Sequence, residues 1–273
     1  MTKNVKLVRL GPHEIKLLFT LESEKKKIFG FQDASAILKI PQHSVANVLY
    51  RLKKKRRITE IEKGKYALSP AVSGVEGYWA EEPHLIVKYL VTPYYVGFWS
   101  ALRYWGLTEQ IPRTVFVATT KRKKTVGYIT QKIKFITLAD KMFFDYTEEK
   151  VNSETFKISS REKTIVDSLL YPQYSGGLYE VTKAIWSGRK ELNWNRILEI
   201  IDIINVDSAR GRLGYILEIL SLKKRIREHL SKKKIKGFRW LDPSAKKDIK
   251  FYSKVWGLKI NVDTKHLLGW RGY

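Results

Sequence analysis

Ten polar and basic side chains between positions 42 and 65 could contact a polyanion. Amide and hydroxyl groups bond well to base edges, whereas lysine and arginine side chains suit phosphate oxygens. The candidate contact residues are Gln42, His43, Ser44, Asn47, Tyr50, Arg51, Lys53, Lys54, Lys63 and Lys65. The chemistry they predict is non-covalent recognition of double-stranded DNA.

A helix that Pro41 opens is predicted to carry most of these candidates. At about 100° per residue, its apolar side chains form one narrow stripe that must face the rest of the fold. The stripe consists of Val45, Val48, Leu49 and Leu52. The polar candidates fall on the opposite side, so the helix would pack against the fold with one face and contact DNA with the other.

Two shorter helices are predicted before it, one after Gly11 and one within the segment FQDASAILK. Their expected inward residues are Ile15, Leu18 and Phe19 in the first helix and Ala34, Ile37 and Leu38 in the second. These helices would support the third.

A hairpin follows the third helix, with its turn at residues 62–65 and with Ile61, Tyr66 and Leu68 available to pack. Three helices and a hairpin predict a winged helix-turn-helix domain over residues 1–73. Its third helix would enter the major groove and its hairpin would meet phosphate. The same residues leave open RNA binding, or a three-helix scaffold for protein contact.

The remaining chain shows no recognisable catalytic motif. It contains no Cys, no two of its five His stand at metal-ligand spacing, and no phosphate-binding glycine loop or GxSxG sequence occurs. Gly97-Phe98-Trp99-Ser100 loosely resembles the start of a nucleotidyltransferase site, but no D-x-D pair follows it. We interpret Trp99 as a core aromatic and predict no enzyme activity, no cofactor and no metal site.

The stretch Arg161-Glu162-Lys163 with Asp167 raises the alternative of a metal-dependent nuclease. Asp167 lies five residues after Glu162, a spacing at which two carboxylates do not share a helix face well. We therefore interpret these charges as a salt-bridged surface.

Residues 74–273 are predicted to form a larger α+β domain with mostly antiparallel strands. Helices are expected around residues 96–106, 159–172, 176–186, 194–204 and 210–222, and strands at 114–119 and 133–139. Ser159 or Ser160 would cap the second of these helices, and Ile165, Val166 and Leu169 would face inward. The fold class expected for the whole chain is thus α+β.

Charge is concentrated at the two ends of the 273-residue chain, whose formal net charge is +25. Residues 1–73 carry 16 Lys or Arg against 6 Asp or Glu, and residues 221–273 carry 16 against 4. So large an excess is expected beside a polyanion. The absence of Cys and of an apolar stretch near the start predicts a cytoplasmic protein with no membrane span.

The basic segment 221–239 has two interpretations between which the sequence does not choose. It could be a second phosphate-binding surface that lengthens a DNA footprint, or a solvated lysine-rich helix. Trp240, Trp256, Leu258 and Ile260 indicate that a last strand returns to the core.

An ordered set of segments resembles the AbiEi-type antitoxins of abortive-infection toxin–antitoxin systems. The segments include PYYVGFWSALRYWGLTEQIPRTVFVATT, SSREKTIVDSLLYPQYSGGLYEVTKAIW, ARGRLGYILEIL and LDPSAKKDIKFYSKVWGLKINVD. The resemblance covers nearly the whole chain, although no single motif in it is specific. The tail LKKRIREHLSKKKIKGFRW is more basic than the family leads one to expect.

The resemblance implies a transcriptional autorepressor and antitoxin in one chain, in a type IV arrangement. Its N-terminal domain would bind inverted repeats in its own promoter as a monomer or dimer. Its C-terminal domain would counter a co-encoded AbiEii-type nucleotidyltransferase toxin, with or without direct contact. Two alternatives remain open: a nucleic-acid-binding or processing protein that uses the middle domain or the basic C-terminal segment, and a docking inhibitor of a partner enzyme.

Overall fold

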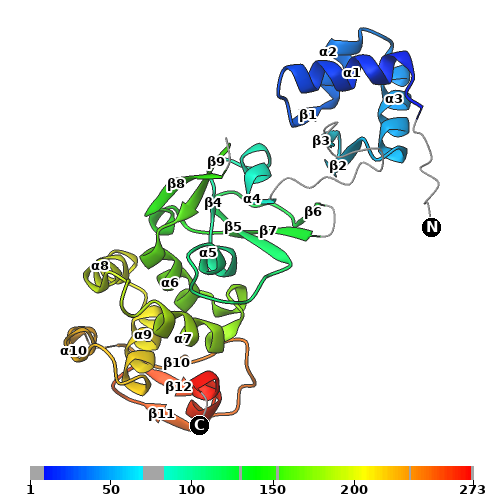
Figure 1. Cartoon of the computed structure of the whole chain (residues 1–273). Coiled ribbons are helices and arrows are strands. Elements are labelled where there is room, and N and C mark those ends of the chain that lie inside the picture. Colours follow the sequence, from blue (N-terminus) through cyan, green and yellow to red (C-terminus); the bar gives the residue numbers. More distant parts are fainter. Residues whose placement is uncertain (1–8, 70–82, 129–130, 152–153, 234, 272–273) are drawn as a thin grey trace, which may run out of the picture. The chain divides into compact units, whose positions relative to one another are not determined.

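The chain is a mixed α+β protein in the computed structural model, which describes residues 9–69, 83–128, 131–151, 154–233 and 235–271 (Figure 1). It divides into two compact units, one of residues 1–90 with 125–133 and one of residues 91–124 with 134–273. The domain boundary predicted at residues 73 and 74 falls within 70–82, outside the described residues. None of the described helices is long and apolar enough to cross a membrane.

The α-helices have the following bounds: α1 (Pro12–Ser23), α2 (Phe31–Leu38), α3 (Gln42–Lys54), α4 (Pro83–Ile86), α5 (Phe98–Tyr104), α6 (Arg161–Leu170), α7 (Gly177–Ser187), α8 (Trp194–Ile204), α9 (Asp207–Ile219), α10 (Lys224–Lys232) and α11 (Thr264–Leu268). Short 3₁₀ helices are η2 (Val87–Tyr89), η3 (Asp140–Met142), η4 (Pro172–Tyr174) and η5 (Gly269–Arg271).

The strands are β1 (Ile28–Gly30), β2 (Ile58–Glu62), β3 (Lys65–Leu68), β4 (Tyr95–Val96), β5 (Thr114–Thr119), β6 (Val126–Tyr128), β7 (Gln131–Thr137), β8 (Tyr146–Val151), β9 (Glu154–Ser159), β10 (Arg239–Trp240), β11 (Phe251–Ser253) and β12 (Leu258–Ile260). They form three sheets, with orders β1-β3-β2, β6-β7-β5-β4-β9-β8 and β10-β12-β11.

The core of the N-terminal unit lies between α1, α2 and α3. The predicted stripe of α3 is confirmed, since Val45, Val48, Leu49 and Leu52 are all buried. The stripe predicted for α1 is wrong at two of its three positions, because Ile15 is 42% and Phe19 64% exposed. Residues at positions 14, 17, 18 and 21 form its buried face instead, which is the i, i+3, i+4, i+7 spacing of a helix that packs on one side.

The hairpin of strands β2 and β3 is confirmed, and Ile61, Tyr66 and Leu68 are buried as expected. Its turn places Gly64 at φ +73°, a conformation that glycine adopts at little cost. Strand β1 was not expected from the sequence. It pairs antiparallel with β3, so the sheet has three strands.

The core of the C-terminal unit is built from α5 to α9 together with β4, β5 and the end of β7. In the six-stranded sheet, β4 pairs antiparallel with β5, β6 with β7 and β8 with β9, whereas β4 and β9 pair parallel. The strands expected at 114–119 and 133–139 correspond to β5 and β7, whereas the β8–β9 hairpin was not expected. Ser160 is the N-cap of α6, as one of the two predicted alternatives, and its Oγ accepts a 3.0 Å hydrogen bond from the Lys163 N–H.

The small sheet β10-β12-β11 is attached to α9 and α6 through a buried arginine. The Arg212 guanidinium donates to the carbonyl oxygens of Leu169 and Leu170 at the end of α6 and of Trp240 and Leu241 at β10, at 2.6–3.1 Å. Burial lowers the pKa of Arg212 to about 10. The final strand expected near residue 258 is β12, and its Leu258 and Ile260 are buried.

Candidate nucleic-acid interface

Helix α3 and the β2–β3 hairpin carry all ten candidate contact residues. Along α3, the side chains that point away from the buried stripe are exposed, and Tyr50 is 63% exposed. The exposed candidates are Gln42, His43, Asn47, Tyr50, Arg51, Lys53, Lys54 and Lys63, and Ser44 and Lys65 are half-buried. The helix ends where Arg56 adopts a positive φ of 56°, so the basic run divides between the helix end and the start of β2.

Arg51 is not a free cation, because it is bound to a buried carboxylate. Its Nε donates to Glu14 Oε1 at 3.0 Å, and Lys55 Nζ donates to Glu14 Oε2 at 2.6 Å. Glu14 Oε2 also accepts the Gly11 N–H at 2.8 Å, so the same carboxylate satisfies the start of α1. Glu14 therefore connects the first turn of α1 to the last turn of α3.

The Glu14 carboxylate stays ionised in this setting. Burial raises its pKa, but the hydrogen bonds from Lys55, the Gly11 N–H and Arg51 together outweigh burial and leave the pKa below its ordinary value. The role of Glu14 was missed in the sequence. A local signal for part of this role is present in the sequence, since an acidic residue at the third position of a helix often accepts the backbone N–H of the N-cap residue.

Replacing Glu14 by Gln is expected to destabilise the N-terminal unit by about 1–3 kcal/mol at pH 7, because a buried charge-assisted network loses its anion. Since the folded pKa is lowered, the ionised carboxylate stabilises the fold above the ordinary value of 4.5, and this stabilisation is lost as pH falls through the lowered pKa. Hydrogen exchange of peptides from α1 and α3 at pH 7 and pH 3 measures both effects.

The matched control is Glu60→Gln. Lys53 Nζ pairs with Glu60 Oε2 at 2.5 Å, but both side chains are about one-third exposed. A surface pair of this kind contributes about 1 kcal/mol or less. Equal loss of protection in the two variants, or a Glu14→Gln variant as acid-sensitive as the wild type, would contradict the role assigned to Glu14.

The lysines near the hairpin differ in whether they already form contacts within the protein. Lys65 Nζ donates to the Tyr89 carbonyl oxygen at 2.7 Å and lies 3.8 Å from Glu62 Oε2. Lys54 and Lys63 form no ion pair with any residue in the described ranges. They are accordingly the candidates best able to bind phosphate without breaking an ion pair to a described residue.

A second group of charges, in the C-terminal unit, contradicts the sequence interpretation. Lys163 and Asp167 are fully buried and form an ion pair, so the salt-bridged surface expected around them is wrong. Tyr95 completes the cluster, with its hydroxyl donating to Asp167 Oδ2 at 2.8 Å and accepting from Lys163 Nζ at 3.0 Å. The neighbouring Ile165, Val166 and Leu169 are also buried, which shows that α6 is surrounded by protein on nearly every side.

Burial dominates the electrostatics of this cluster. It raises the pKa of Asp167 in spite of the Lys163 ammonium and the Tyr95 hydrogen bond, and it raises the pKa of Tyr95 well above its ordinary value. Glu162, the other carboxylate of the proposed nuclease pair, accepts the Asn193 N–H at 2.9 Å. The two carboxylates thus serve different neighbours.

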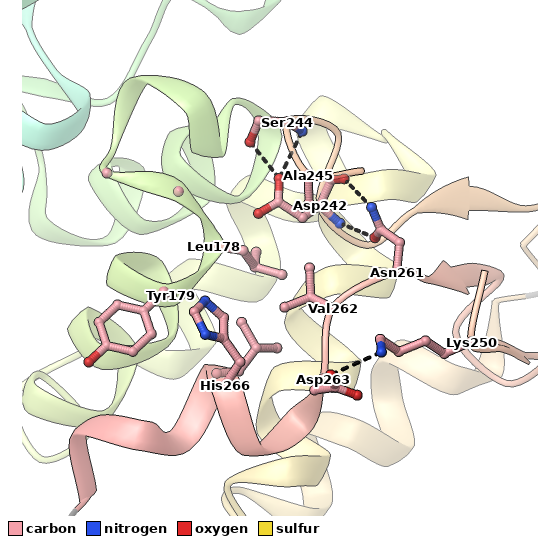
Figure 2. Close-up of a pocket in the computed structure, with 13 residues that line it drawn as sticks. Leu178, Tyr179, Asp242, Ser244, Ala245, Lys250, Asn261, Val262, Asp263 and His266 are labelled. Carbon is pink, nitrogen blue, oxygen red and sulfur yellow. Dashed lines mark hydrogen bonds and ion pairs between the residues drawn. The ribbon is translucent and has the colours of Figure 1, made fainter. Parts of the chain in front are cut away.

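A cleft of about 540 Å³ lies in the C-terminal unit between the start of α7, the loop after β10 and helix α11 (Figure 2). Its acidic groups are engaged, since Asp242 accepts from the Ser244 N–H and hydroxyl and Asp263 pairs with Lys250 at 2.9 Å. Figure 2 shows the Tyr179 and His266 rings side by side, with their centroids 5.6 Å apart. Within the described residues, no three His, Asp or Glu side chains gather as a metal site would require.

The α+β class of the fold is shared with a solved structure. The chain is similar to the RV2827C protein from Mycobacterium tuberculosis, with a TM-score of 0.69 over 97% of this chain and 96% of that one. The two sequences are 12% identical, so the likeness concerns the fold. No protein-family model and no curated protein matches the sequence.

Proposed function

We propose that the chain is a DNA-binding autorepressor and antitoxin whose N-terminal unit is a winged helix-turn-helix. Helix α3 would be the recognition helix and the β2–β3 hairpin the wing. The observation that carries the proposal is the division of α3 into a fully buried apolar stripe and an exposed face of amide, imidazole, phenol and basic groups. A face of this composition suits the major groove, where base edges and phosphates lie within reach of one helix.

The amide and basic side chains of this surface would have different roles on DNA. Gln42 and Asn47, near the N-terminal half of α3, would bond to base edges. Lys54 and Lys63 would bind phosphate directly, and Arg51 would position α3 through Glu14 while presenting its remaining N–H groups. The chain would act by binding and not by catalysis.

The antitoxin half of the proposal rests on the resemblance to AbiEi-type proteins. The partner would be a co-encoded nucleotidyltransferase, whose gene is expected beside this one with G-S and D-x-D motifs. Expression of that gene alone is expected to arrest growth, and co-expression of this chain is expected to restore it.

A stable complex of the two proteins without specific DNA binding would favour a docking inhibitor instead. Metal-dependent turnover of DNA or RNA by the pure chain would favour a nucleic-acid-processing enzyme.

Operator binding is the direct test of the DNA-binding half. In gel shifts with duplex from the chain's own promoter, affinity is expected to exceed that for a scrambled duplex of equal length by about 10³-fold or more. The logarithm of the affinity should fall with the logarithm of salt concentration, with a slope of roughly −0.9 per phosphate neutralised. Equal affinity for both duplexes would leave only non-specific binding and would sink the repressor assignment.

A further inference from the structure

The small C-terminal sheet carries a row of aromatic and basic side chains across all three strands. Trp240 of β10 stands opposite Lys259 of β12, which stands opposite Tyr252 of β11. Residues in register on neighbouring strands project from the same face of a sheet. These three side chains therefore share one face.

On the other face of the sheet, the central strand β12 packs against the protein. Leu258 and Ile260 are buried, and Gly211 of α9 lies so close to Leu258 and Trp256 that an added Cβ would collide with the Trp256 carbonyl. The row therefore points away from α9. Tyr252 is 50% exposed.

Phe238, just before β10, adds a further ring to the row. Its ring meets that of Tyr252 edge to face, with centroids 5.0 Å apart and planes at 75°. Phe238 is 38% exposed. Two aromatic rings in contact leave apolar surface exposed to water, and contiguous exposed apolar surface is often a binding site for a ligand or partner.

Lysines stand directly beside these rings. Lys247 Nζ lies 5.0 Å and Lys259 Nζ 5.2 Å from the centroid of the Trp240 ring. The exposed cations on the adjoining segments are Lys236, Lys246 and Lys254. Of the four acidic residues after position 220, Asp263 is paired with Lys250, which leaves the surroundings strongly positive.

We propose that this face, formed by Phe238, Trp240, Tyr252, Lys247 and Lys259, binds single-stranded nucleic acid. Unpaired bases can stack on exposed rings, and the flanking lysines can bind the phosphates on either side. A duplex keeps its bases stacked within the helix, so it would use the lysines but not the rings. The site shares no residue with α3 and is independent of the proposed operator binding.

Fluorescence anisotropy of the full chain with labelled ten-nucleotide oligo(U) and oligo(dT) tests the proposal. The double change Phe238→Ser with Tyr252→Ser is expected to weaken binding of the single strands at least tenfold. Tyr252→Phe, which keeps the ring, should bind like the wild type. The wild-type salt slope should be roughly −0.7 per phosphate neutralised.

Phe251→Ser is the matched control, because Phe251 is 50% exposed on the same strand but projects from the opposite face. It should leave affinity unchanged, and all variants should keep the wild-type circular dichroism. A preference for oligo(U) over oligo(dT) would assign the site to RNA, and the reverse preference to DNA.

Three results would overturn the proposal: tighter binding to a ten-base-pair duplex than to the single strands, equal losses in the Phe251→Ser control and the double variant, or no loss in the double variant. The last would mean that charge alone binds the strand. Because the probes contain no operator, failure here leaves the operator test unaffected, and failure of operator binding leaves this site standing.

Discussion

Changing Gln42 and Asn47 together to alanine is expected to reduce operator affinity by at least 30-fold while leaving affinity for scrambled duplex within about twofold. Each amide that bonds well to a base edge contributes roughly 1–3 kcal/mol of discrimination. Both side chains are exposed on α3, opposite its buried stripe, so their truncation should not disturb the fold. Gel shifts at fixed salt with the two duplexes measure the difference.

The design of this variant depends on the position of Glu14. Arg51 also lies on the exposed side of α3, but its removal would break a contact to the buried Glu14 and would mix weaker recognition with lower stability. Gln110→Ala is the matched control, since it truncates an exposed amide outside the N-terminal unit. An equal fall in affinity for both duplexes would show that the α3 face gives affinity without specificity.

Charge and specificity should separate in a companion variant. Lys54→Ala with Lys63→Ala removes two cations that have no internal partner in the described residues. It should weaken operator and scrambled duplex alike and reduce the salt slope by roughly 2, because each lysine that binds a phosphate adds about 1 to the slope. A change of sequence preference in this variant would instead place base contacts at the hairpin.

Helical periodicity predicted the buried face of α3 correctly, because the Val and Leu side chains of this helix all lie on one side. In α1 the apolar residues nearly surround the helix, so periodicity alone did not distinguish Leu17 and Leu21 from Ile15 and Phe19. Glu14 is buried on the same side as Leu17 and Leu21, and its basic partners lie 37 and 41 residues further along the chain. Contacts at that separation leave no trace in a local pattern.

The sequence predicted which candidate contact residues lie on the surface, but not which of their side chains are already bound in internal ion pairs. Lys53, Lys54 and Lys63 have the same side chain in the sequence, yet among the described residues Lys53 is paired with Glu60 and the other two form no ion pair. The row of Trp240, Lys259 and Tyr252 depends on strand register, which pairs Lys259 with residues 19 and 7 positions before it. The sequence indicated only that the tail was basic and aromatic.

Changing Asp167 to Ala is expected to destabilise the C-terminal unit by about 3–5 kcal/mol, because it leaves the Lys163 ammonium buried without its anion. A loss of this size is a large share of the roughly 5–15 kcal/mol that holds a typical domain together. Urea unfolding of the full chain measures it, and hydrogen exchange should show the loss of protection in α6 and β4 but not in α1 and α3. The matched control is Lys183→Ala, which removes a surface pair to the 84% exposed Glu109 and should cost about 1 kcal/mol or less.

A variant without the whole cluster distinguishes two causes of the lower stability of Asp167→Ala: the unpaired charge of Lys163 and the reduced side-chain volume. The triple change Tyr95→Phe, Lys163→Met and Asp167→Leu replaces every polar group of the cluster with an apolar one of similar size. Replacing a buried ion pair in this way is often neutral or stabilising, so the triple variant should recover most of the stability that Asp167→Ala loses. If the triple variant is as unstable as Asp167→Ala, the cluster stabilises the fold through its hydrogen bonds to Tyr95 and the shape of its packing. If it is as stable as the wild type, the buried charges add little to stability, and the cost of the single change is that of an unpaired Lys163.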